Sequence, residues 1–302
     1  PATLTTGDTL DGGAGTDTLT VAADLTAAAA VGGFTLSNIE TVQVNVTDGD
    51  TGNAHALTAN MLNSSATTIT TSGLSTTTVS DGVTYNNVAA GTTINVNSAT
   101  NIDVTANFVA AATAGTTALG TPDTVTVTLS GNTATAAADG VLTIGTGFET
   151  IDITSSGTAS SLGDIVTSTA VTMNVSGDAN LTVRSALDAT LDVIDASTMT
   201  GALAITTAND TSTPDATVAG VDVVDVTITG GSGNDIFQIN KGSGRDLITD
   251  YISGKDSIKL LGGLTESDLT FNSYGGDTSI TYNDDLLAIV EDIASASDIT
   301  FI

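Results

Sequence analysis

Apolar and polar residues alternate one by one along much of this 302-residue chain. Val125, Val127 and Leu129 alternate with threonine in "DTVTVTLSG", and Ile151 and Ile153 alternate with threonine and aspartate in "TIDITSS". The stretches "ETVQVNVTDGD", "TTINVNSATNIDVTAN" and "VTMNVSGDANLTV" follow the same pattern. A period of two with β-branched residues is typical of strands that bury one face. Glycine, asparagine, aspartate and serine separate these runs and indicate short turns, so we predict an all-β chain.

Patterns with a helical period are scarce. The runs "DLTAAAAVGG" at 24–33 and "LTANMLNSS" at 57–65 predict two short helices. The stretch "DLLAIVEDIA" at 285–294 instead predicts a strand that leads into a turn.

The scarcity of aromatic residues limits the kind of core that these strands can build. Aromatic residues make up only 3% of the chain, so a thick core between two sheets would be hard to fill. A thin β-solenoid, or β-helix, with valine, isoleucine, leucine and alanine inside each coil fits better. No exact repeat length stands out, so we predict irregular coils. A β-sandwich is the competing fold.

Two short sequence echoes suggest duplicated units. "LSNIETVQVNV" at 36–46 and "GTGFETIDIT" at 145–154 each place an apolar residue before Glu-Thr and an alternating strand. They suggest a division into threonine-rich β-domains at 1–120 and 121–225, followed by a C-terminal part at 226–302. The alternative is that the two strands are alike only in composition.

The charge is strongly acidic and its composition is uneven. The chain has 34 acidic and 5 basic residues, a net charge of −29, and thirty of the acids are aspartates, since only Glu40, Glu149, Glu266 and Glu291 are glutamates. Aspartate favours turns, and its carboxylate is a hard ligand for calcium. The acidity excludes nucleic acid and anionic membranes as partners. It also predicts self-repulsion unless cations neutralise it.

The residue types of most enzyme active sites are missing. His55 is the only histidine and there is no cysteine, which argues against a zinc site or a Cys–His nucleophile. No Gly-x-Ser-x-Gly or phosphate-binding loop is present, and no tryptophan could form a sugar platform. "DGDTGN" at 48–53 spaces oxygen ligands like a calcium loop, but it lacks the distant glutamate; a plain turn is favoured. We predict that the chain is not an enzyme.

A glycine-rich nonapeptide carries the candidate chemistry. "GGSGNDIFQ" at 230–238 and "GGAGTDTLT" at 12–20 both match Gly-Gly-x-Gly-x-Asp-x-apolar-x, and the half-copy "GDTLD" at 7–11 precedes the second. Glycine adopts positive φ, so turn carbonyls can point inward beside the aspartate carboxylate. Stacked turns would surround a cation with oxygen atoms, as calcium prefers. The apolar residues, Leu19 and Phe237, would point into the coil.

The nonapeptide and the segment "KGSGRDLITDYISGKDSIKLLGG" at 241–263 resemble RTX (repeats-in-toxin) proteins, which are exported by type I secretion. The resemblance covers 226–302 and, less closely, 7–24. It implies a calcium-binding β-roll in the C-terminal part. The competing fold then becomes β-sandwich domains followed by that β-roll.

The resemblance also implies a set of calcium ligands. In the C-terminal part these are carboxylates and glycine carbonyls: Asp235, Asp246, Asp250 and Asp256, with Gly231, Gly233 and Gly244. In the N-terminal turns they are Asp8, Asp11 and Asp17. Asp235 and Asp246 are separated by eleven positions rather than nine, so we expect a few ions rather than a long regular roll. The alternative is that these are glycine–aspartate turns without metal.

Several functional expectations follow from the same resemblance. The final "DIASASDITFI" is similar to an uncleaved type I secretion signal. Because Pro1 is not followed by a basic and then an apolar stretch, we expect export without a classical signal peptide, from a chain that is a complete protein or a fragment of a longer one. The threonine- and alanine-rich body resembles Caulobacter-type bacterial surface-layer proteins. We therefore expect a secreted protein of the extracellular cell surface, the C-terminal lattice-forming region of a calcium-dependent self-assembling surface-layer protein. Its expected partners are itself, the type I secretion machinery and cell-surface polysaccharide. The alternatives are an RTX adhesin or biofilm protein, and the C-terminal scaffold of a secreted enzyme.

Overall fold

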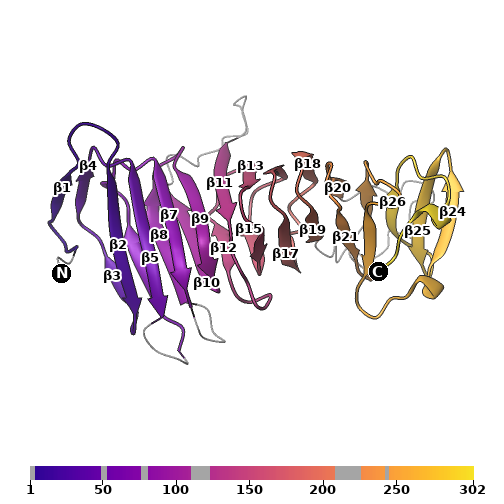
Figure 1. Ribbon diagram of the computed structural model, residues 1–302, viewed down its shortest axis with the longest axis horizontal. Helices are drawn as coiled ribbons and strands as arrows, with labels where there is room; N and C mark the ends of the chain where they lie inside the picture. The colour runs from indigo at the N-terminus through magenta and orange to yellow at the C-terminus, as the bar shows by residue number, and fades with distance from the viewer. Residues whose placement is uncertain (1–3, 49–52, 76–80, 110–122, 208–225, 242–244) are drawn as a thin grey trace.

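The computed structural model describes residues 4–48, 53–75, 81–109, 123–207, 226–241 and 245–302. These residues form an all-β parallel solenoid of about eight turns, which runs from the N-terminal end to the C-terminal end along its long axis (Figure 1). The predicted fold class is confirmed, and the described residues form this solenoid rather than a β-sandwich.

One sheet of thirteen strands extends along nearly the whole molecule. Its first eleven strands pair in parallel, while the last two pair antiparallel and lie at the C-terminal end (Figure 1). In spatial order the strands are β2 (Thr18–Leu25), β5 (Thr41–Asp48), β7 (Thr68–Leu74), β9 (Thr93–Thr100), β11 (Thr124–Ser130), β13 (Thr150–Ser155), β16 (Thr172–Gly177), β18 (Val193–Met199), β20 (Val226–Thr229), β22 (Asp246–Ile248), β26 (Asp285–Val290), β25 (Asp277–Tyr282) and β24 (Thr270–Tyr274).

Shorter sheets form the other sides of the coils. A six-stranded sheet contains β15 (Asp164–Thr167), β12 (Val141–Ile144), β10 (Ile102–Phe108), β8 (Asp81–Val88), β6 (Ala56–Asn60) and β3 (Ala29–Val31). A five-stranded sheet in the C-terminal half contains β14 (Ser160–Leu162), β17 (Leu181–Ala186), β19 (Leu203–Thr206), β21 (Ile236–Ile239) and β23 (Ser257–Leu260). The remaining elements are the pair β1 (Thr9–Asp11) and β4 (Thr35–Ser37), and the 3₁₀ turns η1 (Glu266–Asp268) and η2 (Ala296–Asp298).

The core is a set of aliphatic columns inside the coils. The parallel register places aliphatic residues above one another on successive strands. All members of one such column are buried: Val42, Ile69, Ile94, Val127, Ile153 and Val175. Tyr85 is an exception, since its fully buried hydroxyl exchanges a hydrogen bond of 2.8 Å with Thr71 inside the coil. Such narrow columns leave room for few aromatic rings, in agreement with the composition.

The outward side chains form matching polar rows. Gln43, Thr70, Asn95 and Thr128 lie in register on successive strands of the long sheet, and Asn95 accepts a hydrogen bond from the Thr128 hydroxyl. The number of residues between hydrogen-bonded neighbours in adjacent coils varies: it is 20 between Gly230 and Asp250, 33 between Asn95 and Thr128, and 38 between Asp103 and Val141. The prediction of irregular coils is therefore confirmed.

The two predicted helices are wrong. Within 24–33 the chain ends β2 and forms β3, and within 57–65 it forms most of β6 and a turn. Leu57 pairs in parallel with Ala29 on one side and Val83 on the other, so pairing with neighbouring coils outweighs the helical preference of alanine and leucine. The strand predicted at 285–294 is confirmed as β26. The predicted boundaries near 120 and 225 lie outside the described ranges, so the division into three parts stays a prediction.

Candidate metal centre

Three of the predicted calcium ligands meet at one corner of the C-terminal coils. Ile236 pairs with Ser257, so Asp235 and Asp256, which directly precede them, lie one above the other in adjacent coils. Asp250 reaches the same corner, where its carboxylate binds the glycine turn that leads to Asp235. We call Asp235, Asp250 and Asp256 the aspartate cluster.

Backbone N–H groups bind most oxygens of the aspartate cluster. Asp256 accepts hydrogen bonds from the N–H groups of Asp235 (2.9 Å) and Ile252 (2.7 Å). Asp250 accepts from Gly230 and Gly231, both at 2.7 Å. Asp235 Oδ1 accepts from the N–H of Leu203 in the preceding coil at 2.7 Å. These bonds fix the carboxylates across three successive coils.

The second oxygen of Asp235 is the exception. Asp235 is 1% exposed, and its Oδ2 is buried without a hydrogen-bond partner among the described residues. A buried carboxylate oxygen without a donor is costly, and a cation would offset that cost. The residues therefore fit calcium at this oxygen.

Carboxylates alone do not complete a metal cage in the described part of the chain. No group of three or more histidine, cysteine, aspartate or glutamate side chains there has the arrangement to hold a metal ion. Carbonyl ligands from the glycine turn, as the sequence motif implies, would have to supply the remaining oxygens.

The predicted glycines have a packing role of their own. A Cβ at Gly231, whose φ is +96°, would lie 2.3 Å from the carbonyl oxygen of Ala196, and one at Gly233 would lie 2.3 Å from that of Gly201. Both contacts are with the preceding coil. These positions therefore require glycine for close stacking, whether or not a metal binds.

Burial and like charge change the proton affinity of the cluster. Burial, followed by the neighbouring Asp256 and Asp250 carboxylates, raises the pKa of Asp235 to about 7. Burial is also the main cause that raises the pKa of Asp256. Both shifts indicate a corner with unfavourable negative charge, which is the electrostatic condition for binding a cation.

In calcium-free solution, stability is expected to fall as the pH rises from about 4 to about 7. The ordinary aspartate pKa is 3.8 and that of folded Asp235 is about 7, so between these values the folded chain holds a proton that the unfolded chain has lost. Raising the pH then favours unfolding. Chemical denaturation across this range should show a shallower decline for Asp235→Asn than for the wild type. An equal decline in both proteins would show that Asp235 is not the group responsible.

The other C-terminal ligands are outside this cluster or outside the described ranges. Asp246 starts β22, where it is buried and its Oδ2 accepts a hydrogen bond of 2.8 Å from the Thr207 hydroxyl. Gly244 lies outside the described residues.

The N-terminal turns hold their aspartates in a different way. Asp8 accepts from the N–H and hydroxyl of Thr5. Asp11 accepts from Asn38 and from the N–H of Gly13, and these bonds lower its pKa. Only Asp17 is similar to Asp235, since its Oδ2 is buried without a hydrogen-bond partner among the described residues. Asp17 is therefore the strongest candidate ligand of the N-terminal turns, whereas Asp8 caps its own turn and Asp11 also binds Asn38.

Two glutamates that were not predicted as site residues have equivalent positions. Glu40 Oε2 accepts from the N–H of Asp17 at 2.8 Å, and Glu149 Oε2 accepts from the N–H of Asp123 at 2.9 Å. Both belong to the Glu-Thr pairs of the sequence echo, in which the threonine is the first residue of β5 or β13. The echo therefore reflects one local structure used twice, and it was the signal that could have identified Glu40.

The C-terminal tail packs against the candidate centre. The Tyr251 hydroxyl donates to the carbonyl oxygen of Asp256 at 2.9 Å and accepts from the N–H of Thr300 at 2.8 Å. Ile258 also donates its N–H to the carbonyl oxygen of Thr300. The tail that resembles a secretion signal is thus part of the folded coil.

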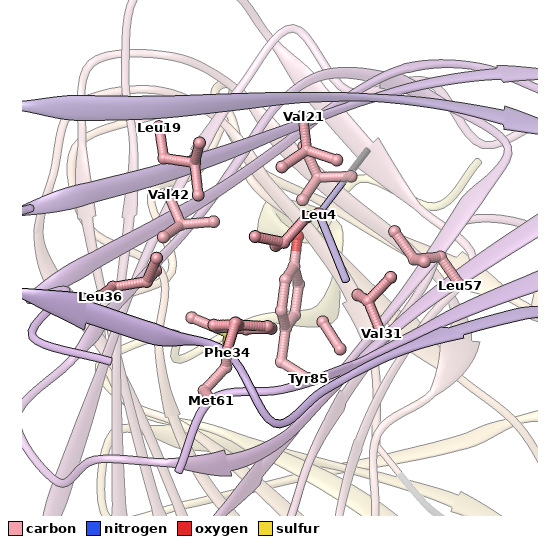
Figure 2. Close-up of a pocket in the computed structure, with 12 residues that line it drawn as sticks. Leu4, Leu19, Val21, Val31, Phe34, Leu36, Val42, Leu57, Met61 and Tyr85 are labelled. Carbon is pink, nitrogen blue, oxygen red and sulfur yellow. The ribbon is translucent and has the colours of Figure 1, made fainter. Parts of the chain in front are cut away.

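A cavity at the N-terminal end offers no comparable chemistry. Figure 2 shows Leu4, Leu19, Val21 and Val31 around a small apolar space inside the first coils, with Tyr85 beside it. Its volume is about 20 Å³, and apolar walls of this kind favour an empty cavity. The aspartate cluster remains the stronger candidate.

The fold and the corner geometry define the class of protein as an all-β parallel solenoid with stacked glycine–aspartate turns. In comparisons with known proteins, no family model, curated protein or solved structure matches the chain. The described residues contain no helix with the length and hydropathy of a membrane span.

Proposed function

We propose that this chain is a calcium-dependent structural protein of the extracellular cell surface, which assembles with copies of itself into a surface layer. The observation that carries the proposal is the buried Asp235 Oδ2, which has no donor among the described residues and lies in a corner with two further carboxylates. The RTX-like turns and the surface-layer-like composition support the same function.

The chain's own residues prepare the corner for a cation. The N–H groups of Leu203 and Asp235 orient the carboxylates of Asp235 and Asp256, and Gly231 lets the turn pack against the preceding coil. Calcium, when bound, would supply two positive charges to this group of carboxylates. Asp235 would bind it through Oδ2, together with carbonyls of the glycine turn, while the nearby Asp250 and Asp256 carboxylates would supply further negative charge.

Self-assembly is proposed from the surface of the solenoid. At a net charge of −29, copies of the chain repel one another unless cations lie between them. The long sheet presents rows of threonine, asparagine and glutamine rather than an aromatic binding platform. Its edge strand, β2, pairs only with β5 in the described part of the chain, and edge strands are sites of association. These features favour a repetitive contact surface over a substrate site.

Calcium is expected to raise the free energy of unfolding of the purified protein. An ion that binds only the folded chain contributes about 2.7 kcal/mol per site at a hundredfold excess over its dissociation constant. Chemical denaturation in calcium and in chelator should show this gain for the wild type. Asp235→Ala should lose the part contributed by the C-terminal site.

The matched control is Asp298→Ala, which removes an exposed carboxylate of η2 and should keep the full calcium gain. An equal calcium gain in Asp235→Ala and the wild type would contradict the proposed role of Asp235. No gain in the wild type would contradict calcium dependence altogether.

A further inference from the structure

The basic residues are concentrated in one part of an otherwise acidic chain. No lysine or arginine precedes Arg184, and the other four basic residues are Lys241, Arg245, Lys255 and Lys259. Lys241 lies 4.8 Å from the centroid of the Tyr282 ring. This clustering indicates a local role for the positive charges. The predicted calcium ligands are carboxylates and carbonyls, so they do not account for it.

Lys255 lies at the aspartate cluster itself. It directly precedes Asp256, and its ammonium group donates to the carbonyl oxygen of Ser232 in the preceding coil. Ser232 stands between the two predicted glycine ligands, Gly231 and Gly233. The side chain therefore joins the two turns that carry Asp235 and Asp256.

The backbone around Lys255 holds this arrangement in place. The N–H groups of Lys255 and Asp256 both donate to the carbonyl oxygen of Ile252, at 3.0 and 2.9 Å. This tight turn fixes the start of the lysine side chain next to the cluster. The positive charge of Lys255 acts to lower the pKa of both Asp235 and Asp256, against the larger opposing effect of burial.

We propose that Lys255 is a tethered counter-ion of the aspartate cluster, which partly neutralises the cluster in the absence of calcium and weakens calcium binding in its presence. The ammonium group binds the carbonyl oxygen of Ser232, between the two predicted carbonyl ligands Gly231 and Gly233, so its charge lies next to the glycine turn that would hold the ion, and like charges repel. This inference rests on the proposed calcium site.

The N-terminal turns provide a natural contrast. Asp8, Asp11, Asp17 and Glu40 lie in the first 183 residues, which contain no lysine or arginine. They have no tethered cation, so their negative charge depends on ions from solution. The C-terminal turns, in contrast, are built to hold their fold at low calcium.

The test is Lys255→Met, which keeps much of the side-chain length and removes the charge. Unfolding in chelator gives the stability without calcium. Calcium affinity at this corner is measured by displacement of terbium excited through the tyrosines, among which Tyr251 contacts Asp256. We expect a lower unfolding midpoint in chelator, together with a calcium dissociation constant about tenfold lower than in the wild type.

Two variants serve as controls. Lys255→Arg keeps the charge and should restore both values toward the wild type. Lys259→Met removes an exposed lysine from β23, four positions along the chain, and should change neither value appreciably.

The opposite signs of the two effects distinguish a counter-ion from a packing residue. A Lys255→Met protein that is unfolded in chelator but folds on addition of calcium also supports the proposal. Loss of stability together with weaker calcium binding, or failure to fold in calcium, overturns it, because a structural role explains both. Calcium binding with unchanged affinity overturns this inference alone, whereas no calcium binding by the wild type overturns it together with the proposed calcium site.

Discussion

Replacing Asp256 with alanine is expected to lower the free energy of unfolding in calcium-free solution by about 2 kcal/mol. The Asp256 carboxylate accepts N–H groups from Asp235 and Ile252, and the residue is buried. Alanine would leave both donors without this acceptor, and the donor of Asp235 belongs to a buried residue. The substitution also removes a negative charge beside Asp235, and this offsets part of the loss of stability, since burial and like charge disfavour both ionised carboxylates.

Equilibrium denaturation of three proteins tests this expectation. Asp256→Asn keeps one carbonyl acceptor and the side-chain volume, so its loss should be smaller than that of Asp256→Ala. Asp298→Ala, at an exposed position, should stay within about 0.5 kcal/mol of the wild type. If Asp256→Ala is as stable as Asp298→Ala, the two hydrogen bonds do not hold the corner together.

The fold could be predicted from the sequence because its strongest signal is local. The alternation of Val125, Val127 and Leu129 indicates a strand with one buried face, and this can be recognised without knowing which strands lie beside it. The stretch forms β11. The low aromatic content pointed to a thin core, as the stacked Ile69, Ile94 and Val127 confirm. The run of alanines at 27–30 misled the prediction, since strand pairing with the next coil is a non-local effect.

The candidate site could be predicted only in part. The resemblance to RTX proteins implied Asp235, Asp250 and Asp256 as ligands, and the structure brings these three residues to one corner. The sequence could not show which carboxylate stacks on which N–H group, because the coil length varies and the register is therefore unknown. Asp246 was grouped with the others for that reason, yet it binds Thr207 at the start of β22.

The role of Lys255 was hidden for the same reason. Its contact with Ser232 joins two coils and spans 23 positions in sequence. Basic residues near the motif were visible, but only the stacking of the coils brings this lysine beside the aspartates. Glu40 was missed although its echo with Glu149 was seen, because a resemblance between two strands does not say which atoms they bind.

Self-assembly is the prediction with the largest expected effect, because it is all or none. The chain carries a net charge of −29, and this repulsion acts between copies as well as within one copy. Calcium would reduce the charge at the turns and bridge carboxylates of neighbouring copies. Removing calcium should therefore disperse the assembly before it unfolds the C-terminal coils, where Lys255 partly replaces the ion.

Electron microscopy of the purified protein in millimolar calcium, beside the same preparation in chelator, is the decisive test of calcium-dependent self-assembly. We expect ordered sheets in calcium that disperse in chelator. Folded, dispersed monomers in both solutions would contradict self-assembly and would favour an adhesin or the scaffold of a secreted enzyme.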